Sequence, residues 1–185
     1  MAREIMDLYD RDGRPTGRTI ERGQPVPAGF YRKTVHLGLF SPEGKLLCQK
    51  RAADKSIWPD LWDISVGGGV QAGESPEAAM SRELKEELGL AHDFSEERPV
   101  LIATYNDGFS WIYALVMEVQ LSELCLEPSE VSAAAWLDQA EIETAIENGT
   151  FIEYAPGFIP LLFFRRNHPG VINDPLLFGK SRPGL

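Results

Sequence analysis

The sequence has 185 residues, of which 43% are hydrophobic and 25% charged, and its formal net charge is −10. A chain of this length and composition can bury a sizeable hydrophobic core, as a globular protein does. The acidic balance argues against general nucleic-acid binding, because most of the surface would repel a phosphate backbone. The longest apolar run near the end, residues 158–164, is interrupted by Pro160 and is far shorter than the roughly 20 residues of a membrane span.

The N-terminal residues and the cysteines both favour the cytoplasm. The first residues, MAREIMDLYDRDGR, include acids and lack an apolar segment, so they do not resemble a secretory signal. The two cysteines, Cys48 and Cys125, lie in apolar segments. We therefore expect buried, reduced thiols rather than a disulfide or a metal site.

The first elements are predicted to be strands. Residues 5–9 and 17–20 are extendable segments on either side of DRDG, and Asp-Gly between such runs is typical of a β-hairpin. Residues 34–40 and 45–51 predict a second hairpin, joined by the turn sequence SPEG. We expect residues 1–30 to form a hairpin and connector of the same domain as residues 31–168, and residues 169–185 to form an irregular tail.

A glycine-rich segment leads into the best-defined helix. Residues 61–66, LWDISV, predict a strand that runs into three glycines, which allow a tight turn or close approach to a ligand. The residues before this strand, 52–60, have no periodicity and predict an exposed loop. In the helix that follows, we expect Ser75 to be the N-cap, Pro76 the first residue and Gly89 the stop.

The second half of the chain alternates strands and helices. Residues 100–105 and 110–121 predict two strands joined by the turn sequence NDG. Asp138 and Glu141 indicate a capping box that begins a helix, and residues 151–166 predict partly helical structure. Because hairpins exclude a purely parallel sheet, the predicted fold class is α/β, with a mixed sheet and helices on its faces.

Acidic residues gather on one side of the predicted central helix. Glu83, Glu86 and Glu87 fall within an arc of about 100° on an α-helix. Three carboxylates this close repel one another unless a cation lies among them, and an oxygen-only set suits Mg²⁺ or Mn²⁺ rather than Zn²⁺. Arg82 can pair with Glu86 or with Glu74. The alternative for such a run of acids is a solvated helix face.

The acids belong to a longer pattern with nine specified positions. Residues 68–90 read Gly-x5-Glu-x7-Arg-Glu-Leu-x-Glu-Glu-x-Gly-Leu, which resembles the signature of the Nudix hydrolases. The resemblance implies an α/β/α sandwich in which Mg²⁺ or Mn²⁺ serves the hydrolysis of a diphosphate by an activated water. It also implies the site residues: Glu83, Glu86 and Glu87 as metal ligands, the carbonyl of Gly67 as a further candidate ligand, and Arg82 with Glu74 as the pair that orients them.

A looser resemblance covers roughly residues 4–140. The N-terminal hairpin, the segment LLCQKR and the order Lys55, Trp58-Pro59, Trp62-Asp63 are similar to the Nudix branch allied to isopentenyl-diphosphate isomerase. The isomerases use a cysteine on the strand that leads into this region and a histidine-bearing segment beside it, whereas LWDISVGGGV has neither. We therefore expect Mg²⁺-dependent hydrolysis of a diphosphate linkage, with isomerisation or a non-catalytic ligand-binding module as the alternatives.

Several residues outside the signature are candidates for binding the substrate. Lys50, Arg51 and Lys55 are placed to grip phosphates or are solvated strand-end charges. Trp62, like Trp58, is a candidate for stacking on a base, or belongs to the core or its rim.

Glu130 lies where many members of the resembled family carry an acid near the metals, so it is a candidate base or further ligand, or a surface charge. Phe109, Trp111 and Tyr113 alternate along a strand and suit a pocket face or the core. No role is assigned to the histidines. The expected partner is a small diphosphate-containing substrate, and a homodimer through the hairpin or the tail is a candidate assembly.

Overall fold

The computed structural model describes residues 4–167, so the predicted irregular tail, 169–185, lies outside the described residues. The strands are β1 (Ile5–Tyr9), β2 (Pro15–Glu21), β3 (Arg32–Phe40), β4 (Leu46–Arg51), β5 (Trp62–Asp63), β6 (Val66–Gly69), β7 (Leu101–Tyr105), β8 (Gly108–Val116) and β9 (Val131–Leu137). The helices are α1 (Pro76–Leu88), α2 (Gln139–Glu147) and α3 (Phe158–Arg165), with a 3₁₀ turn, η1, at Leu121–Glu123. None of these helices is both long and apolar enough to cross a bilayer.

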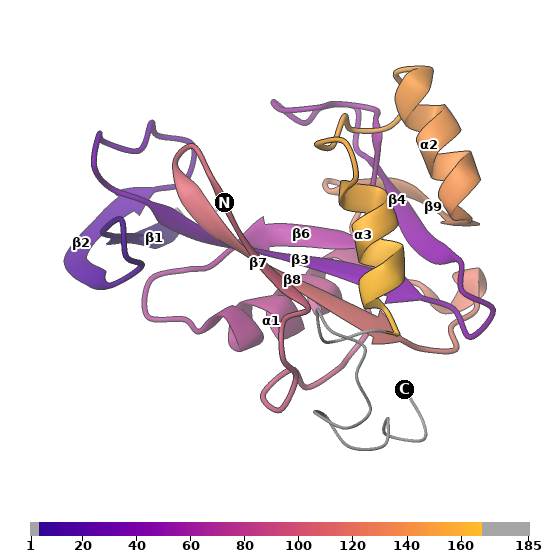
Figure 1. Cartoon of the computed structure of the whole chain (residues 1–185), viewed down its shortest axis with the longest axis horizontal. Helices are drawn as coiled ribbons and strands as arrows, with labels where there is room; N and C mark the ends of the chain where they lie inside the picture. The colour runs from indigo at the N-terminus through magenta and orange to yellow at the C-terminus, as the bar shows by residue number, and fades with distance from the viewer. Residues whose placement is uncertain (1–3, 168–185) are drawn as a thin grey trace.

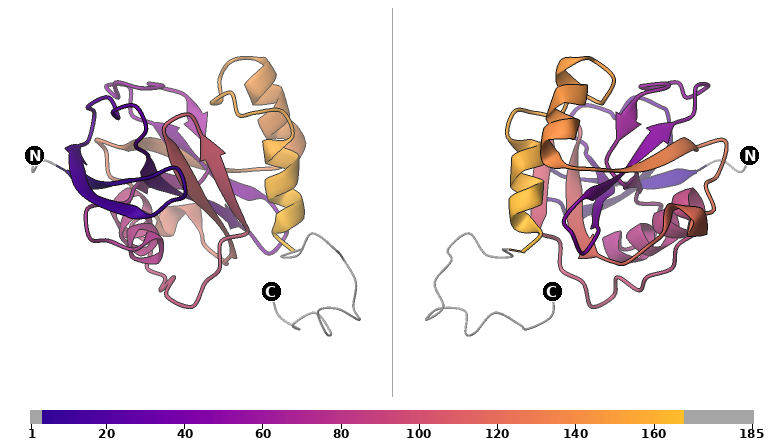
Figure 2. Two further views of the ribbon diagram at one scale, coloured as in Figure 1. Left: turned by 60° about the vertical axis from the view of Figure 1, so that its left-hand side comes forward. Right: turned by 90° about the vertical axis from the view of Figure 1, so that its right-hand side faces the viewer.

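The main sheet is mixed, as predicted. Its order is β5-β4-β3-β8-β7, with β6 paired to β3 and β9 paired to β4. Strand β3 runs parallel to β8, and the other pairs are antiparallel. Helix α1 covers one face of the sheet, and α2 and α3 lie on the other (Figures 1 and 2). The predicted α/β/α sandwich is therefore confirmed.

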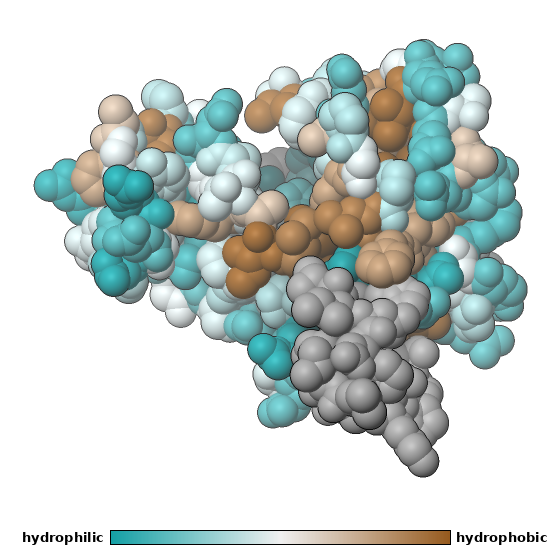
Figure 3. All heavy atoms as spheres, viewed as in Figure 1, coloured by the Kyte–Doolittle hydropathy of each residue, from teal (hydrophilic) through white to brown (hydrophobic). Residues whose placement is uncertain are grey.

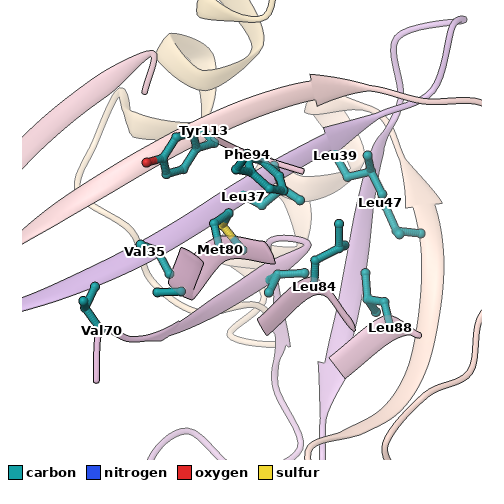
Figure 4. Packing of buried hydrophobic residues seen from close by; sticks show 12 residues of the cluster. Val35, Leu37, Leu39, Leu47, Val70, Met80, Leu84, Leu88, Phe94 and Tyr113 are labelled. Atoms are coloured by element: carbon teal, nitrogen blue, oxygen red, sulfur yellow. The ribbon is translucent and has the colours of Figure 1, made fainter. Parts of the chain in front are cut away.

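Helix α1 is anchored by the stripe of apolar residues on its inner side. Met80, Leu84 and Leu88 are fully buried and pack against β3 residues such as Val35 and Leu37 (Figure 4). The same packing brings Glu83 and Glu87 against the backbone of β6, outside the apolar core.

Both ends of α1 follow the sequence signals. The hydroxyl of Ser75 accepts a hydrogen bond from the amide of Ala78 at the first turn, and Gly89 ends the helix with φ 72°. Left-handed backbone of this kind favours glycine. The predicted bounds of the helix are confirmed.

The sheet forks between β3 and β4. These strands were expected to form a hairpin, but they pair only at Phe40 and Leu46 before they separate. The hydroxyl of buried Ser65 fills the fork, since it accepts from the amide of Leu39 on β3 (2.8 Å) and donates to the carbonyl of Leu47 on β4 (2.6 Å). One side chain thus bridges the two strands where their own ladder stops, and β6 and β5 take up the pairing with β3 and β4 beyond it.

The fork explains why the single strand expected over residues 61–66 was wrong. The chain pairs first with β4, through Trp62 and Asp63, and then crosses at Ser65 to pair with β3 through residues 66–69. The three glycines lie in β6 itself rather than in a turn. The backbone of β6 therefore forms one edge of the fork, next to α1.

Two further expectations were wrong. The strand predicted over residues 110–121 ends at Val116, because its parallel neighbour β3 ends at Phe40 and offers no further partners. Cys125 is exposed rather than buried, whereas Cys48 is buried as expected, and neither forms a disulfide.

The predicted N-terminal hairpin, β1 and β2, is present and is attached close to α1. The amide of Gly73, in the loop before α1, donates to the carboxylate of Asp7 (2.8 Å), and the amide of Ala72 donates to the carbonyl of Ile5 (2.8 Å). The ammonium of Lys33 on β3 lies 3.9 Å from the centre of the Tyr9 ring. The hairpin is thus bound both to the sheet and to the loop that precedes the acidic helix.

Candidate functional site

Arg82 lies at the centre of the acidic site and contacts both of its predicted partners. Its guanidinium binds both carboxylate oxygens of Glu74 (each 3.0 Å) and also reaches Glu83 (2.8 Å) and Glu86 (3.0 Å). It further donates to the carbonyl of Gly69 on β6 (2.9 Å). A planar guanidinium suits this forked arrangement, so Arg82 joins the loop, the helix and the sheet edge.

Two of the three candidate metal ligands are buried. Glu83 and Glu87 are each 6% exposed, whereas the side chain of Glu86 is 56% exposed. Burial raises the pKa of Glu83 to about 7, although Arg82 opposes the shift. Burial, and then the nearby charge of Glu83, raise the pKa of Glu87 well above its ordinary value. Two buried acids that lie near each other each disfavour the charged form of the other.

One carboxylate oxygen of Glu87 is suited to a cation. Its Oε2 is buried and, within the described residues, has no hydrogen-bond partner. An unpaired buried carboxylate oxygen is costly, and an oxygen-only donor set matches the preference of Mg²⁺ and Mn²⁺. In residues 4–167 no three His, Cys, Asp or Glu side chains are already placed around a common point as metal ligands. Arg82 instead holds Glu83 and Glu86 toward itself.

The glycines of β6 make room for this site. A Cβ on Gly68 would lie 2.0 Å from the carboxyl carbon of Glu83, so only glycine allows that carboxylate to pack against the strand. The backbone of Gly67 lies close enough to Glu87 to favour its charged form. These contacts place both glycines beside the buried acids, and a role for the carbonyl of Gly67 as a metal ligand stays a prediction.

Glu130 and Lys55 were predicted separately, but they form one pair. The ammonium of Lys55 lies 2.5 Å from a carboxylate oxygen of Glu130. The backbone also joins the two segments, because the amide of Ala52 donates to the carbonyl of Glu130 (2.9 Å).

The other predicted substrate-binding cations contact their own loop. Lys50 lies 2.6 Å from a carboxylate oxygen of Asp60. Arg51 donates to the carbonyls of Ile57 and Trp58 and so orders residues 52–60. A role for either side chain in binding phosphate stays a prediction.

The aromatic candidates divide between core and surface. Trp62 packs on the core between the sheet and the helices α2 and α3, whereas Trp58 is 55% exposed. On β8, Trp111 and Tyr113 belong to the core beneath α1. Phe109, near the start of β8, has its ring centre 5.6 Å from that of Tyr31.

Sequence reasoning missed Asp63, a buried acid in β5. Its Oδ1 accepts from the hydroxyl of Tyr154 (2.5 Å) and from the amide of Ile64 (2.8 Å). Burial raises the pKa of Asp63, and its charge raises that of Glu87 in turn. The signal was an acid inside the apolar segment LWDISV.

Sequence reasoning also missed Arg22, which follows β2. Its guanidinium lies 2.7 Å from Glu4. Burial works against its charge, but the hydrogen bond to Glu4 raises the pKa of Arg22 overall, and the carboxylates of Glu83 and Glu130 raise it further. No local pattern marks this residue, because only the folded hairpin brings it toward the acids.

Known proteins share the fold and the sequence pattern. Residues 30–155 match the family model of the NUDIX domain. An uncharacterized Nudix hydrolase of Listeria monocytogenes is 35% identical over 164 residues, which cover 89% of this chain and 96% of that protein. An isopentenyl-diphosphate Delta-isomerase of Streptomyces coelicolor is 28% identical over 152 residues, which cover 80% of this chain and 77% of that protein. The crystal structure of DR0079 from Deinococcus radiodurans matches with a TM-score of 0.71 and 27% identity, over 86% of this chain and 97% of that one.

Proposed function

This chain belongs to the Nudix hydrolase family, and we propose that it hydrolyses a diphosphate linkage in a small substrate with Mg²⁺ or Mn²⁺ as cofactor. The observation that carries the proposal is the buried pair Glu83 and Glu87, with an oxygen on Glu87 that no group in residues 4–167 hydrogen-bonds. Such a pair is unfavourable without a cation, and a cation is what an acidic protein needs to hold an anionic diphosphate.

In this proposal the carboxylates of Glu83, Glu86 and Glu87 hold the ion together with the carbonyl of Gly67. The ion, when bound, supplies positive charge to the diphosphate and lowers the pKa of water. Arg82 contacts both Glu83 and Glu86, and Glu86, the exposed one of the two, has the room to turn from the arginine toward the ion.

The remaining residues position this set. Arg82 and Glu74 hold the loop before α1 against β6 through their two-point contact and the bond to Gly69. Glu130, held by Lys55, is proposed to accept the proton of the attacking water. Lys50, Arg51, Lys55 and Trp62 stay candidates for contacts with the substrate.

Isomerisation is the alternative that the similarity to the Streptomyces coelicolor isomerase raises. The cysteines argue against it, because Cys48 is buried in the core and Cys125 lies next to Gly89, at the end of α1. Neither is on the strand that leads into the acidic site. Proton exchange into isopentenyl diphosphate would favour isomerisation. Binding of diphosphates without turnover of any of them would favour the non-catalytic ligand-binding module.

Substitution of the carboxylates tests the proposed hydrolysis. With Mg²⁺ present, we expect Glu86→Gln and Glu87→Gln each to slow the release of phosphate or monophosphate from nucleoside diphosphates by at least about 100-fold, or about 2.7 kcal/mol. Glu147→Gln, an exposed acid at the end of α2, changes the net charge equally and should leave the rate unchanged. Equal rates in all three variants would contradict the proposal.

The surroundings of the protein are also proposed. We place it in the cytoplasm, with a small diphosphate as its partner and with homodimerisation through the N-terminal hairpin or the tail. Light scattering that gives the mass of one chain would contradict the dimer.

A further inference from the structure

The helices α2 and α3 pack over one end of their sheet face and not over the other. At one end of β3, Phe40 is fully buried, and a Cβ on Gly38 would lie 3.1 Å from the side chain of Leu162 on α3. Toward the other end, Thr34 and His36 are on the same face but are only partly buried. Figure 1 shows α3 crossing the sheet near one end only, and Figure 3 shows the outline hollowed between the side of the N-terminal hairpin and the side of α2.

The part of the face away from α3 carries polar side chains from three neighbouring strands. The Nδ1 atom of His36 on β3 is 2.7 Å from the hydroxyl of Ser110 on β8. The hydroxyl of Tyr105 on β7 donates to that of Thr34 (3.5 Å). Pairing across the sheet places Thr34 beside Ser110. We call these four residues, Thr34, His36, Tyr105 and Ser110, the polar floor.

The polar floor adjoins the acidic site across one strand. His36 pairs with Gly67, and a Cβ on Gly67 would lie 3.0 Å from the imidazole Cδ2. The next residue, Gly68, has its opposite face filled by Glu83. A substrate with its diphosphate at the carboxylates can therefore extend around β6 and reach the floor.

Ser110 holds the imidazole in a defined orientation. Ser110 is buried and occupies Nδ1, so Nε2 is the ring atom that can serve a ligand. An orienting hydrogen bond of this kind fixes which nitrogen meets a ligand. An apolar group laid against Nε2 would remove water from that atom without replacing the hydrogen bond.

We propose that the polar floor binds the part of the substrate that is not phosphate, and that His36, positioned by Ser110, selects a hydrogen-bonding sugar or heterocycle over a hydrocarbon chain. This inference rests on the proposed function and adds the residues that determine specificity. It predicts that the enzyme prefers nucleoside diphosphates to isopentenyl diphosphate, and that the preference depends on His36.

The test uses the full chain with Mg²⁺ and three probes: the nucleoside diphosphate turned over best, isopentenyl diphosphate, and inorganic pyrophosphate as an inhibitor. We expect His36→Ala to raise KM for the nucleoside diphosphate roughly tenfold or more. The change in kcat should stay within about threefold, and the Ki of pyrophosphate should not change, because pyrophosphate does not reach the floor. Ser110→Ala should shift KM in the same direction by less, and His36→Gln should restore part of the loss.

The control is His92→Ala, which removes a histidine bound to Glu97 on the surface. It should change neither the KM for the nucleoside diphosphate nor the Ki of pyrophosphate. Equal KM values for wild type and His36→Ala, or an equal rise in the pyrophosphate Ki, would overturn the inference, as would a wild-type preference for isopentenyl diphosphate. Failure of the proposed hydrolysis gives a different result, no Mg²⁺-dependent release by the wild type. In that case calorimetric Kd values for the nucleoside diphosphate still test the floor. If His36→Ala does not fold, the same Kd is measured with Ser110→Ala.

Discussion

The space beside Gly68 can hold either the carboxylate of Glu83 or a side chain on residue 68, but not both. The carboxylate of Glu83 packs where a Cβ on Gly68 would stand, and Arg82 fixes it there. The position of a proposed metal ligand is therefore set by the absence of a side chain on the neighbouring strand.

We expect Gly68→Ala to displace Glu83 and to reduce Mg²⁺-dependent hydrolysis at least about 100-fold. The overpacked contact should also cost about 1–3 kcal/mol of stability. Initial rates and urea unfolding measure the two effects. Gly69→Ala is the matched control, since its Cβ would meet only the flexible end of Met6 at 2.9 Å. Equal losses of activity in both variants would show that the space next to Glu83 is not special.

Single residues were predictable from the sequence where local spacing determines their place. The three glutamates and Arg82 come from one helix, so their common side follows from helical geometry. Asp63, Arg22 and His36 reach the site from a strand, a hairpin and the sheet interior, and only tertiary structure brings them together. Whether Arg82 pairs with Glu74 or Glu86 was also open, and the guanidinium has enough donors for both.

At the scale of elements, the fork between β3 and β4 depends on one hydroxyl. Ser65 is fully buried and serves both strands. Removal of this hydroxyl leaves a buried amide on Leu39 and a buried carbonyl on Leu47 without that partner, and unsatisfied groups of this kind cost more than the hydrogen bond itself is worth.

We therefore expect Ser65→Ala to lower the free energy of unfolding by about 1–3 kcal/mol, measured by urea denaturation. Ser132→Ala removes an exposed hydroxyl that binds the carbonyls of Lys50 and Arg51 and should cost less than about 1 kcal/mol. If the two serines cost the same, the fork does not depend on Ser65.

The elements were predictable to different degrees. Helix α1 has capping residues at both ends, so both of its bounds followed from these signals, and the capping box of Asp138 and Glu141 fixed the start of α2. The fork did not follow, because LLCQKR and LWDISV both have the composition of extended strands with an apolar part. Nothing local tells which strand each will pair with. The end of β8 at Val116 likewise depends on the length of its neighbour.

At the scale of the whole molecule, three acids among residues 4–167 are buried near one another: Asp63, Glu83 and Glu87. Burial raises the pKa of each. A raised pKa means that the folded state keeps protons that the unfolded state has lost. The free energy of unfolding of the metal-free protein should therefore be highest at low pH in this window and fall as pH rises from about 4 toward 7 and above.

Asp63→Asn tests this linkage without changing a proposed metal ligand. The asparagine does not titrate, so the fall in stability that begins above the ordinary value of 3.8 for Asp63 should become shallower. Thermal unfolding in a chelator across this pH range measures the slope. Asp54→Asn, in the exposed loop, removes the same charge and should leave the slope as it is. An unchanged slope in Asp63→Asn would contradict the assignment.

The position of β6 between the polar floor and the carboxylates has an evolutionary consequence. Gly67 faces His36 on one side and Gly68 faces Glu83 on the other, so one thickness of backbone separates the polar floor from the carboxylates. Substitutions on the floor can change which molecule is accepted without disturbing the groups proposed to break the bond. A lineage built on this scaffold can thus acquire new substrates in single mutational steps while its chemistry is inherited intact.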